Sequence, residues 1–308
     1  MKMKKILYPI ILSLTIGFGS ASFNIGANAE NRLNSMYAVN TTSTKVNVSV
    51  DVVQNVGSAE INWSEGVIKV TGAGAPPSKG SAAQKRLMAV RAAKADAYRQ
   101  LLEAINGVQV SSETVVKDFV TESDVIRTQV QGLVKGAQQI GDPRYMSDGS
   151  VEIDMVISLF GASSVASIIK PETQKTTTPP TSIEVPPDVV QEVKNDGFTG
   201  IIVDCRGLGG EAAMSPSIQD ENGGEVYVGN LPIDPDYVVN EGIVAYTNSL
   251  EEANKNERAG KNPLMIKGIK VKGSFKSDVI ISNDDAEKVL GANQVGNFLK
   301  DSKVVILL

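Results

Sequence analysis

The stretch SAAQKRLMAVRAAKADAYRQLLEAINGV, residues 81–108, carries the strongest structural signal in this 308-residue chain. Ser81 and Gln84 have the S-x-x-Q spacing of a capping box, and Gly107 follows Asn106 where a helix would end. With 3.6 residues per turn, the apolar side chains gather on one broad face, which is typical of a helix that packs on a sheet. That face holds Ala83, Leu87, Val90, Ala93, Ala97, Tyr98, Leu101, Ala104 and Ile105.

Segments with strand periodicity lie on both sides of this helix. The sequence DGSVEIDMVISLF, residues 148–160, alternates apolar and polar side chains and predicts a half-buried strand over 151–160. We expect residues 131–140 to form the strand that pairs with it. Two short apolar runs, 61–63 and 67–70, flank a glycine turn and predict a hairpin before the helix.

A further alternation stands near the start of the predicted domain. Val46, Val48, Val50 and Val52 are separated by polar residues, so one face of this strand would be apolar. Unpaired backbone groups on an edge strand can bond to a neighbouring molecule. We therefore interpret these four valines as a candidate interface strand of a homo-oligomer.

The chain divides at a segment rich in proline and threonine. Residues 171–188, PETQKTTTPPTSIEVPPD, contain five prolines, a composition typical of an extended linker. We predict an α+β fold of two domains, 46–170 and 197–308, joined by a Pro/Thr-rich linker over 171–196. Each domain would be a mainly antiparallel sheet with helices packed on one face.

The second domain shows a series of short apolar segments. Its last five residues, Val304–Leu308, are all apolar, and we expect them to be paired into a sheet or docked on a partner. The predicted strands are 198–204, 225–228, 242–246, 264–271, 279–282 and 304–308. The predicted helices are 249–255, 284–290 and 294–300.

The N-terminal region has the pattern of a secretory signal peptide. Lys2, Lys4 and Lys5 precede a 14-residue apolar run, and small residues at Ala27-Asn28-Ala29 predict cleavage after Ala29. The run is shorter than the roughly 20 apolar residues that span a bilayer. We therefore expect a signal peptide over 1–29, a flexible leader over 30–45, and a soluble periplasmic or secreted protein.

Cysteine usage bears on membrane attachment. The only cysteine is Cys205, so no cysteine follows the predicted cleavage site to carry a lipid, and we expect no direct lipid anchor. A single cysteine also rules out an intramolecular disulfide. Cys205 ends an apolar strand, and we interpret it as a buried core residue rather than a reactive thiol.

Composition excludes several classes of function. The chain has no histidine, which removes Ser-His-Asp and Cys-His nucleophile pairs and the commonest general base. Loss of the signal peptide's three lysines would change the formal net charge from −5 to −8, which argues against binding of nucleic acid. No pair of acids has the look of a general acid/base couple. We expect no catalytic residues, no metal site and no cofactor.

Three motifs are candidates for ligand binding. Gly207, Gly209 and Gly210 follow an apolar strand and form a candidate ligand loop. A dinucleotide fingerprint needs a helix to begin there, but Ser215-Pro216 follows and the pattern is not helical, so a turn between strands is favoured. The acidic segment 220–225 lacks the order of ligands and glycine of a calcium loop and predicts a hairpin turn. Asp234-Pro235-Asp236 is likewise interpreted as a turn.

The central region resembles a known family. The residues Arg91-Ala92-Ala93, Asp96-Ala97-Tyr98, Leu101-Leu102-Glu103 and Gly107 fit the pattern of the Lpp-twenty lipoprotein family over about residues 80–160. That family includes the FlgP-like flagellar proteins of the outer membrane, and it is similar to the N-terminal domain of the flagellar H-ring protein FlgT. The resemblance implies a non-enzymatic envelope protein that assembles into rings or disks. This chain lacks the family's lipidated cysteine, so any association with the outer membrane would depend on protein partners.

These observations lead to one favoured function and two alternatives. We expect a structural or assembly protein of the cell envelope, associated with a flagellar or other outer-membrane machine and acting by contacts with its own copies or another envelope protein. The alternative is a periplasmic module that binds a small ligand or peptide near Gly207–Gly210. An enzyme that uses carboxylates is the third choice, because no acid/base constellation is found.

Overall fold

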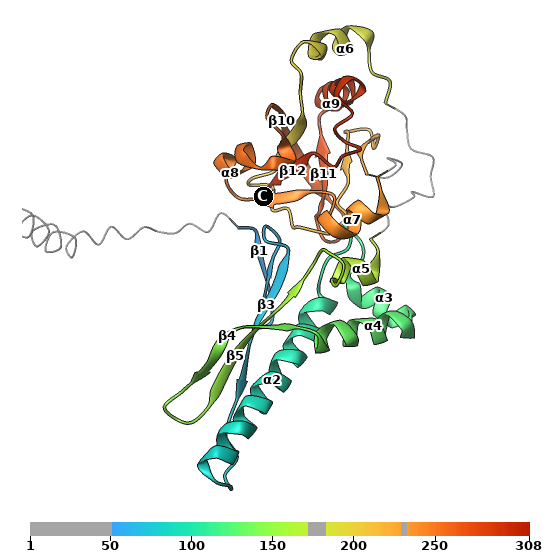
Figure 1. The fold of residues 1–308 in the computed structure, drawn as a ribbon. Coiled ribbons are helices and arrows are strands. Elements are labelled where there is room, and N and C mark those ends of the chain that lie inside the picture. Colours follow the sequence, from blue (N-terminus) through green and yellow to red (C-terminus); the bar gives the residue numbers. More distant parts are fainter. Residues whose placement is uncertain (1–50, 172–182, 229–232) are drawn as a thin grey trace, which may run out of the picture. The chain divides into compact units, whose positions relative to one another are not determined.

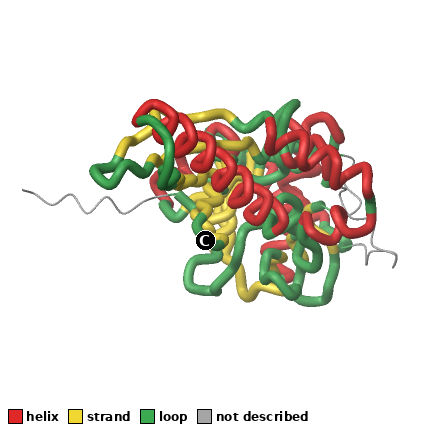
Figure 2. The backbone as a smooth tube through the Cα atoms, turned by 90° about the horizontal axis from the view of Figure 1, so that it is seen from below, coloured by secondary structure: helices red, strands yellow, loops and turns green. Residues whose placement is uncertain are grey.

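The computed structural model describes residues 51–171, 183–228 and 233–308. The predicted signal peptide, leader and Val46, Val48 and Val50 lie outside the described residues, as does most of the Pro/Thr-rich segment. The described residues all belong to one compact unit. Runs of strands and runs of helices follow one another along it, and the α+β class is confirmed (Figures 1 and 2).

The first sheet has five antiparallel strands in the order β1-β2-β3-β5-β4. The predicted hairpin forms β2 and β3, and the strand predicted over 151–160 is β5, whose residues are alternately buried and partly exposed. The bounds are β1 Val53–Val56, β2 Ala59–Asn62, β3 Val67–Gly74, β4 Gln138–Tyr145 and β5 Val151–Ser158.

The strand predicted over 131–140 is wrong in its first half. Helix α4 (Asp124–Lys135) continues through it, Gly136 caps the helix, and β4 begins only at Gln138. Val130 and Val134 are buried one helical turn apart, and this spacing favours the helix. Strand β4 is an edge strand with almost every residue exposed, so no alternation marks it in the sequence.

Helix α2 (Ala82–Asn106) begins and ends where the sequence predicts. Ser81 accepts a hydrogen bond from the Gln84 amide, the Gln84 side chain returns one to the Ser81 amide, and Gly107 caps the other end. The predicted apolar face is correct only from Ala89 onward. Leu87 is 53% exposed, because the first two turns of the helix extend beyond the buried part of the sheet.

The helix lies unusually close to strand β3. A Cβ atom on Gly72 would stand 2.2 Å from the carbonyl oxygen of Ala93, and one on Gly74 would stand 2.1 Å from that of Ala89. Ala89, Ala93 and Ala97 are fully buried on the facing side of the helix. Only a glycine strand against an alanine face permits this spacing of the two backbones.

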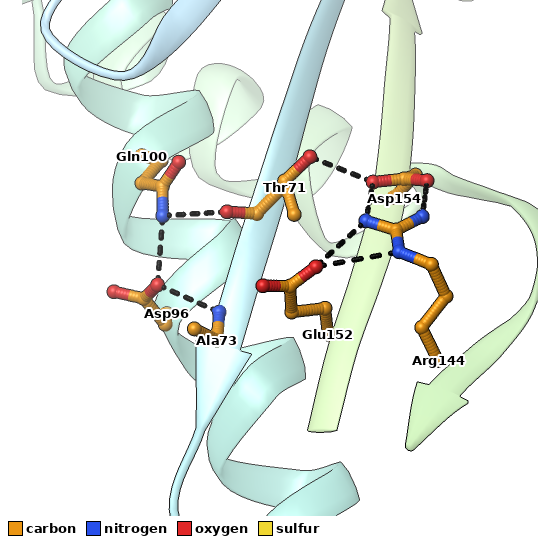
Figure 3. A network of polar contacts seen from close by, with 7 residues as sticks. All are labelled: Thr71, Ala73, Asp96, Gln100, Arg144, Glu152 and Asp154. Atoms are coloured by element: carbon orange, nitrogen blue, oxygen red, sulfur yellow. Dashed lines mark hydrogen bonds and ion pairs between the residues drawn. The ribbon is translucent and has the colours of Figure 1, made fainter. Parts of the chain in front are cut away.

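Polar side chains of the helix complete the edge of the strand that β2 leaves open. Strand β2 pairs with β3 only as far as Lys69. Beyond it, Asp96 accepts a hydrogen bond from the Ala73 amide (3.0 Å), and Gln100 donates one to the Thr71 carbonyl (3.0 Å; Figure 3). The side-chain amide of Gln100 also donates a hydrogen bond to the Asp96 carboxylate. The helix thus supplies the hydrogen bonds that a sixth strand would have made.

On the opposite face of the sheet, Arg144 bridges two strands. Its guanidinium pairs with Glu152 and Asp154 of β5, and the Thr71 hydroxyl also donates to Asp154 (Figure 3). Arg144, together with Thr71, holds the pKa of Asp154 below its ordinary value. These charges are partly exposed, so each pair adds little to the free energy of unfolding.

The other helices in this half of the chain are α3 (Val116–Glu122), α4 and α5 (Val165–Ile169). Ser123 is the N-cap of α4, and its hydroxyl accepts a hydrogen bond from the Ile126 amide. Helix α6 (Pro187–Lys194) lies inside the region 171–196 that was predicted as a linker, so the prediction is wrong for these residues. Pro187 occupies the first helical position, where proline is favoured, and Val189 and Val193 lie against Gly291.

The second sheet has seven strands in the order β8-β7-β11-β10-β6-β12-β9. It is mixed: β10–β6, β6–β12, β12–β9 and β11–β7 are parallel, so the prediction of a mainly antiparallel sheet is wrong here. The bounds are β6 Gly200–Asp204, β7 Ile218–Gln219, β8 Glu225–Tyr227, β9 Ala245–Thr247, β10 Pro263–Lys272, β11 Asp278–Ile281 and β12 Val304–Leu307.

Helices cover both faces of this sheet, where one face was predicted. On one face, Ile202, Val305 and Leu307 pack against Ala253 and Ala259 of α8 and η1. The alternate residues of β6 and β12 join the main core together with α9. Burial on both faces explains the uninterrupted apolar runs, as in parallel sheets generally. The helices are α7 Pro235–Glu241, α8 Leu250–Lys255, η1 Glu257–Ala259 and α9 Asn283–Gly296.

Two predictions of local structure in this half need correction. The helix predicted over 284–290 continues to Gly296 as α9 and is capped by Asn297 in a left-handed conformation, so the separate helix predicted over 294–300 is wrong. Asp234-Pro235-Asp236, interpreted as a turn, is the start of α7, with Asp234 as N-cap and Pro235 at the first position. The acidic segment 220–225 forms the predicted hairpin turn, between β7 and β8.

We expect the substitution Gly72→Ala to lower the free energy of unfolding by several kcal/mol, because the added methyl group overlaps the α2 backbone. The matched control is Gly132→Ala in the middle of α4, where a Cβ meets nothing within 4 Å. That change should stabilise the protein by about 0.5–1 kcal/mol. Urea unfolding monitored by circular dichroism measures both. Equal effects of the two substitutions would contradict the close approach.

We expect Asp96→Asn to destabilise the protein by about 1 kcal/mol at neutral pH, because the carboxylate accepts several hydrogen bonds. These bonds, that from Ala73 first, lower the pKa of Asp96 in the folded state. The stabilisation is therefore present above the unfolded pKa, about 3.9, and is lost as the pH falls through the lower folded value. The difference between the two proteins in urea melts should shrink on acidification; a constant difference would contradict this.

Candidate functional site

The candidate ligand loop connects β6 to β7 and opens no helix. Gly207 and Gly209 have φ angles of +80° and +68°, and the Leu208 amide donates to the Cys205 carbonyl to form a turn. Arg206, the cation of the loop, pairs with Asp204 at 2.6 Å. The next element begins only at Ile218. The loop therefore lacks the helix N-terminus that a phosphate cradle of this kind uses.

Gly210 has a different role from the other two glycines. A Cβ atom there would lie 3.1 Å from Leu308 and 3.2 Å from Val271, so this position is packed against the C-terminus and β10. Positions 207 and 209 have open space around them. The structure thus brings the three predicted residues together in one turn, but with only two of them at the surface.

Cys205, which precedes this loop, is 1% exposed, as expected for a core residue. Burial, aided by the charge of Asp204, raises the pKa of its thiol to about 12. A thiol with so high a pKa is neutral at physiological pH and is a poor nucleophile.

We therefore expect Cys205 to resist an aromatic disulfide reagent in the native protein and to react at once in urea. Because its pKa is raised in the folded state, its contribution to stability is complete below the unfolded pKa, about 8.5, and is lost as the pH rises from there toward 12. Absorbance of the released thiolate measures the reaction. Rapid labelling of the native chain at neutral pH would contradict this burial.

The candidate interface strand is only partly within the described residues. Of its four valines, Val52 alone is described, and it precedes β1. Its amide donates to the Ser64 hydroxyl and its carbonyl accepts from the Trp63 amide, both at 2.9 Å. The backbone of Val52 is therefore bonded within the chain, so it does not offer these groups to a neighbouring molecule. The interface role of Val46, Val48 and Val50 stays a prediction.

The sequence did not identify a segment that joins the two sheets. Residues 109–113, here named the docking segment, begin three residues after the end of α2. Gln109 and Val110 accept backbone hydrogen bonds from Met214 and Ser215, and Ser112 accepts one from Phe275. The two predicted domains thus share backbone hydrogen bonds, whereas their separate folding stays a prediction.

Side chains strengthen this junction. Gln109 donates to Glu211 (2.5 Å), and the Ser112 hydroxyl donates to Asp278 (2.6 Å). Glu113 accepts from both the amide and the hydroxyl of Ser274. Gly273 is also required, because a Cβ there would stand 2.3 Å from that of Ser112.

A cavity of about 220 Å³, here named the junction cavity, lies beside the docking segment. Its lining residues include four serines, three carboxylates and one lysine. The lining residues are Ser111, Ser112, Glu113, Ser215, Ser217, Gln219, Glu225, Val228, Lys272, Gly273 and Asp278. The sequence alone could not reveal this site, because the residues that line it come from four separate stretches of the chain.

Beside this cavity, one fully buried hydroxyl has no hydrogen-bond partner among the described residues. Ser215 is 4% exposed, and its Oγ atom makes no hydrogen bond among the described residues. Ser277, next to the lining residue Asp278, also has a buried hydroxyl without a hydrogen-bond partner among the described residues. An unsatisfied buried polar atom costs about 1–3 kcal/mol, so each such atom in a native protein calls for an explanation.

A second surface feature lies at the start of α2. Leu87, Met88, Tyr145 and Met146 are each exposed by more than a third, and together they are named here the apolar tip. The Arg86 guanidinium stands 3.8 Å from the centre of the Tyr145 ring and so links the helix to the end of β4. Both ends lie in the lower part of Figure 1. Among residues 51–171, 183–228 and 233–308, no helix is long and apolar enough to cross a membrane.

The comparisons with known proteins reach only the second half of the chain. Residues 200–308 match the family model of the second domain of Treponema pallidum Tp0624. No curated protein matches the chain. The match begins at the first residue of β6 and contains the whole seven-stranded sheet. It leaves residues 80–160 uncovered, so their resemblance to the Lpp-twenty family stays a prediction.

Proposed function

We propose that this chain is a non-catalytic, exported envelope protein that acts by assembling with other copies of itself. The apolar tip is the observation that carries this proposal. Scattered exposed apolar side chains are common on soluble proteins, but a group drawn from two elements is typical of a surface that contacts protein. A helix and a strand contribute to this group, and Arg86 holds the two together.

Charge around the tip supports contact between copies. Lys85 and Arg86 lie on the helix side, whereas Asp142 and Asp148 lie along β4 and the turn after it. Charges of both signs on one small surface allow the helix side of one copy to face the strand side of the next. Repeated contacts of this head-to-tail kind close into rings when the rotation permits.

The residues behind the family resemblance support a structural role as well. Ala93 and Ala97 face Gly72, Asp96 bonds to the open edge of β3, and Leu101 is fully buried. Gly107 ends α2, and a Cβ atom there would lie 3.1 Å from the Val56 side chain. Each part of the pattern thus has a role in packing or in backbone hydrogen bonding. Export and association with a flagellar or outer-membrane machine belong to the same proposal and depend on the sequence of residues 1–29 and on the resemblance.

Sedimentation velocity of the purified chain tests the proposal. We expect the parent to form a concentration-dependent oligomer at high micromolar concentration. Leu87→Glu places a charge in the tip and should shift the distribution toward monomer, with the far-ultraviolet circular dichroism unchanged because Leu87 is half exposed.

The matched control is Val125→Glu in α4, an identical type of change at a residue that is 66% exposed and outside the tip. It should leave the oligomer intact. A parent that sediments as a monomer throughout, or an equal response of the two variants, would overturn assembly through the tip.

A further inference from the structure

The second sheet has one part, along β10, that its helices leave uncovered. Strand β10 pairs in parallel with β6, so Met265 and Lys267 lie on the same face as their partners Ile202 and Asp204. Ile202 packs against α8 and η1 on that face, but Met265 is 44% exposed and Lys267 is exposed as well. This part of the sheet is therefore accessible to another molecule.

A β-bulge adds an apolar side chain to this surface. The pairing of β10 with β11 shifts its register between Gly268 and Lys270, which leaves Ile269 as the extra residue. A bulge bends its strand and redirects a side chain. Ile269 is 44% exposed, and Lys270 next to it is exposed too.

The lysines beyond the bulge lie on the same side of the sheet as Met265. Lys270 is opposite Ile280 of β11, and the neighbours of Ile280, Val279 and Ile281, belong to the main core. Because side chains alternate along a strand, Lys270 faces away from that core, and so does Lys272 two residues later. The surface, here named the basic strand face, consists of Met265, Lys267, Ile269, Lys270 and Lys272.

The three lysines of the basic strand face are not neutralised by acids of their own chain. None of them forms a salt bridge within the described residues. Asp204, opposite Lys267, is already paired with Arg206, and Lys272 donates to the side-chain oxygen of Gln219 at 3.3 Å. Like charges gathered on one surface favour a partner of opposite charge.

The main-core side of the same sheet carries an acidic helix. Helix α9 packs on that side, and α6 lies against α9, with Val189 and Val193 next to Gly291. Residues 184–196 contain four exposed acids and one lysine, Lys194, so their formal charge is 1 − 4 = −3. The four acids, here named the acidic helix face, are Glu184, Asp188, Glu192 and Asp196. They too form no salt bridge within the described residues.

We propose that the basic strand face binds the acidic helix face of a second copy of this chain. Three positive charges then meet a formal charge of −3, and Met265 and Ile269 are covered in the contact. The two faces lie on opposite sides of one sheet, so each copy contacts one neighbour on either side. Such heterologous contacts repeat into a ring or a filament, according to the rotation between copies. The contact uses no residue of the apolar tip and goes beyond assembly through it.

Sedimentation velocity with charge reversals tests this contact. Every chain in the test carries Leu87→Glu, which blocks the apolar tip, so that failure of the tip and failure of the new contact are distinguished. We expect the Leu87→Glu chain still to associate at high micromolar concentration. Adding Lys267→Glu and Lys270→Glu should weaken this association at least tenfold, because two acidic faces then meet. Adding Asp188→Lys and Glu192→Lys instead should weaken it equally. A Leu87→Glu chain that stays monomeric would overturn the proposal.

An equimolar mixture of the two reversed chains is the sharpest test. The intact acidic helix face of the first chain then meets the intact basic strand face of the second, and the two reversed faces are also of opposite sign. We expect the mixture to form complexes, although neither chain associates alone. A mixture that stays monomeric would overturn the pairing of these two faces.

The matched control reverses two exposed lysines elsewhere, Lys117→Glu in α3 and Lys135→Glu in α4. It changes the net charge by the same amount as the reversal on β10 and should leave the association unchanged. An equal loss in both would show general repulsion between the chains and would overturn the contact. All substituted side chains are exposed, so each chain should fold, which circular dichroism checks.

A membrane of anionic lipid is the other partner that a basic strand face could meet. Flotation of the Leu87→Glu chain with phosphatidylglycerol vesicles measures this binding. We expect the chain not to float with the vesicles, because its formal net charge of −5 repels them. Vesicle binding that is lost with Lys267→Glu and Lys270→Glu, in a chain that does not self-associate, would assign the face to lipid and overturn the contact between copies.

Discussion

The close approach of α2 to β3 is the constraint on which the first half of the molecule depends. Gly72 and Gly74 bring the strand within backbone distance of Ala89 and Ala93, closer than any larger side chain would allow. At that distance the side chains of Asp96 and Gln100 reach the open edge of the strand and bond to it. One helix thereby both covers a face of the sheet and completes the hydrogen bonds of its edge.

The position of α2 also determines where the two sheets meet. The docking segment begins three residues after the last residue of the helix, and its backbone bonds directly to Met214, Ser215 and Phe275. A shift of the helix along β3 would therefore move the docking segment and the wall of the junction cavity with it. The glycine–alanine contact therefore also affects the second sheet, because only Gly107 and Val108 lie between the end of α2 and the docking segment.

The second sheet is organised by a different requirement. Its central strands, β6 and β12, are buried on both faces, so helices must cover both sides. The C-terminal strand β12 lies between β6 and β9, which makes the last residues of the chain part of the centre of the sheet rather than its margin. Tyr246, on β9, both donates to and accepts from the backbone of Ala213, and burial raises its pKa well above the ordinary value.

The sequence by itself determined the features that depend on neighbouring residues. Capping residues at Ser81 and Gln84, the alternation of β5 and the apolar run of β12 each act within a few positions, so the elements and their ends could be predicted. Local pattern also predicted the hairpin at 220–225 and the burial of Cys205. It failed for β4, whose exposure on both faces leaves no period to detect.

Only the tertiary structure decided how these elements combine. Parallel pairing of β6 with β12 joins strands about a hundred residues apart, and the apolar runs alone do not specify direction. Gly72 and Gly74 lie beyond the apolar run 67–70 that predicts the strand, and only the packing of α2 against them shows why glycine is needed there. The exposure of Leu87 and the isolation of Ser215 likewise depend on distant segments, because burial and hydrogen bonding are properties of the packed chain and not of the sequence near each residue.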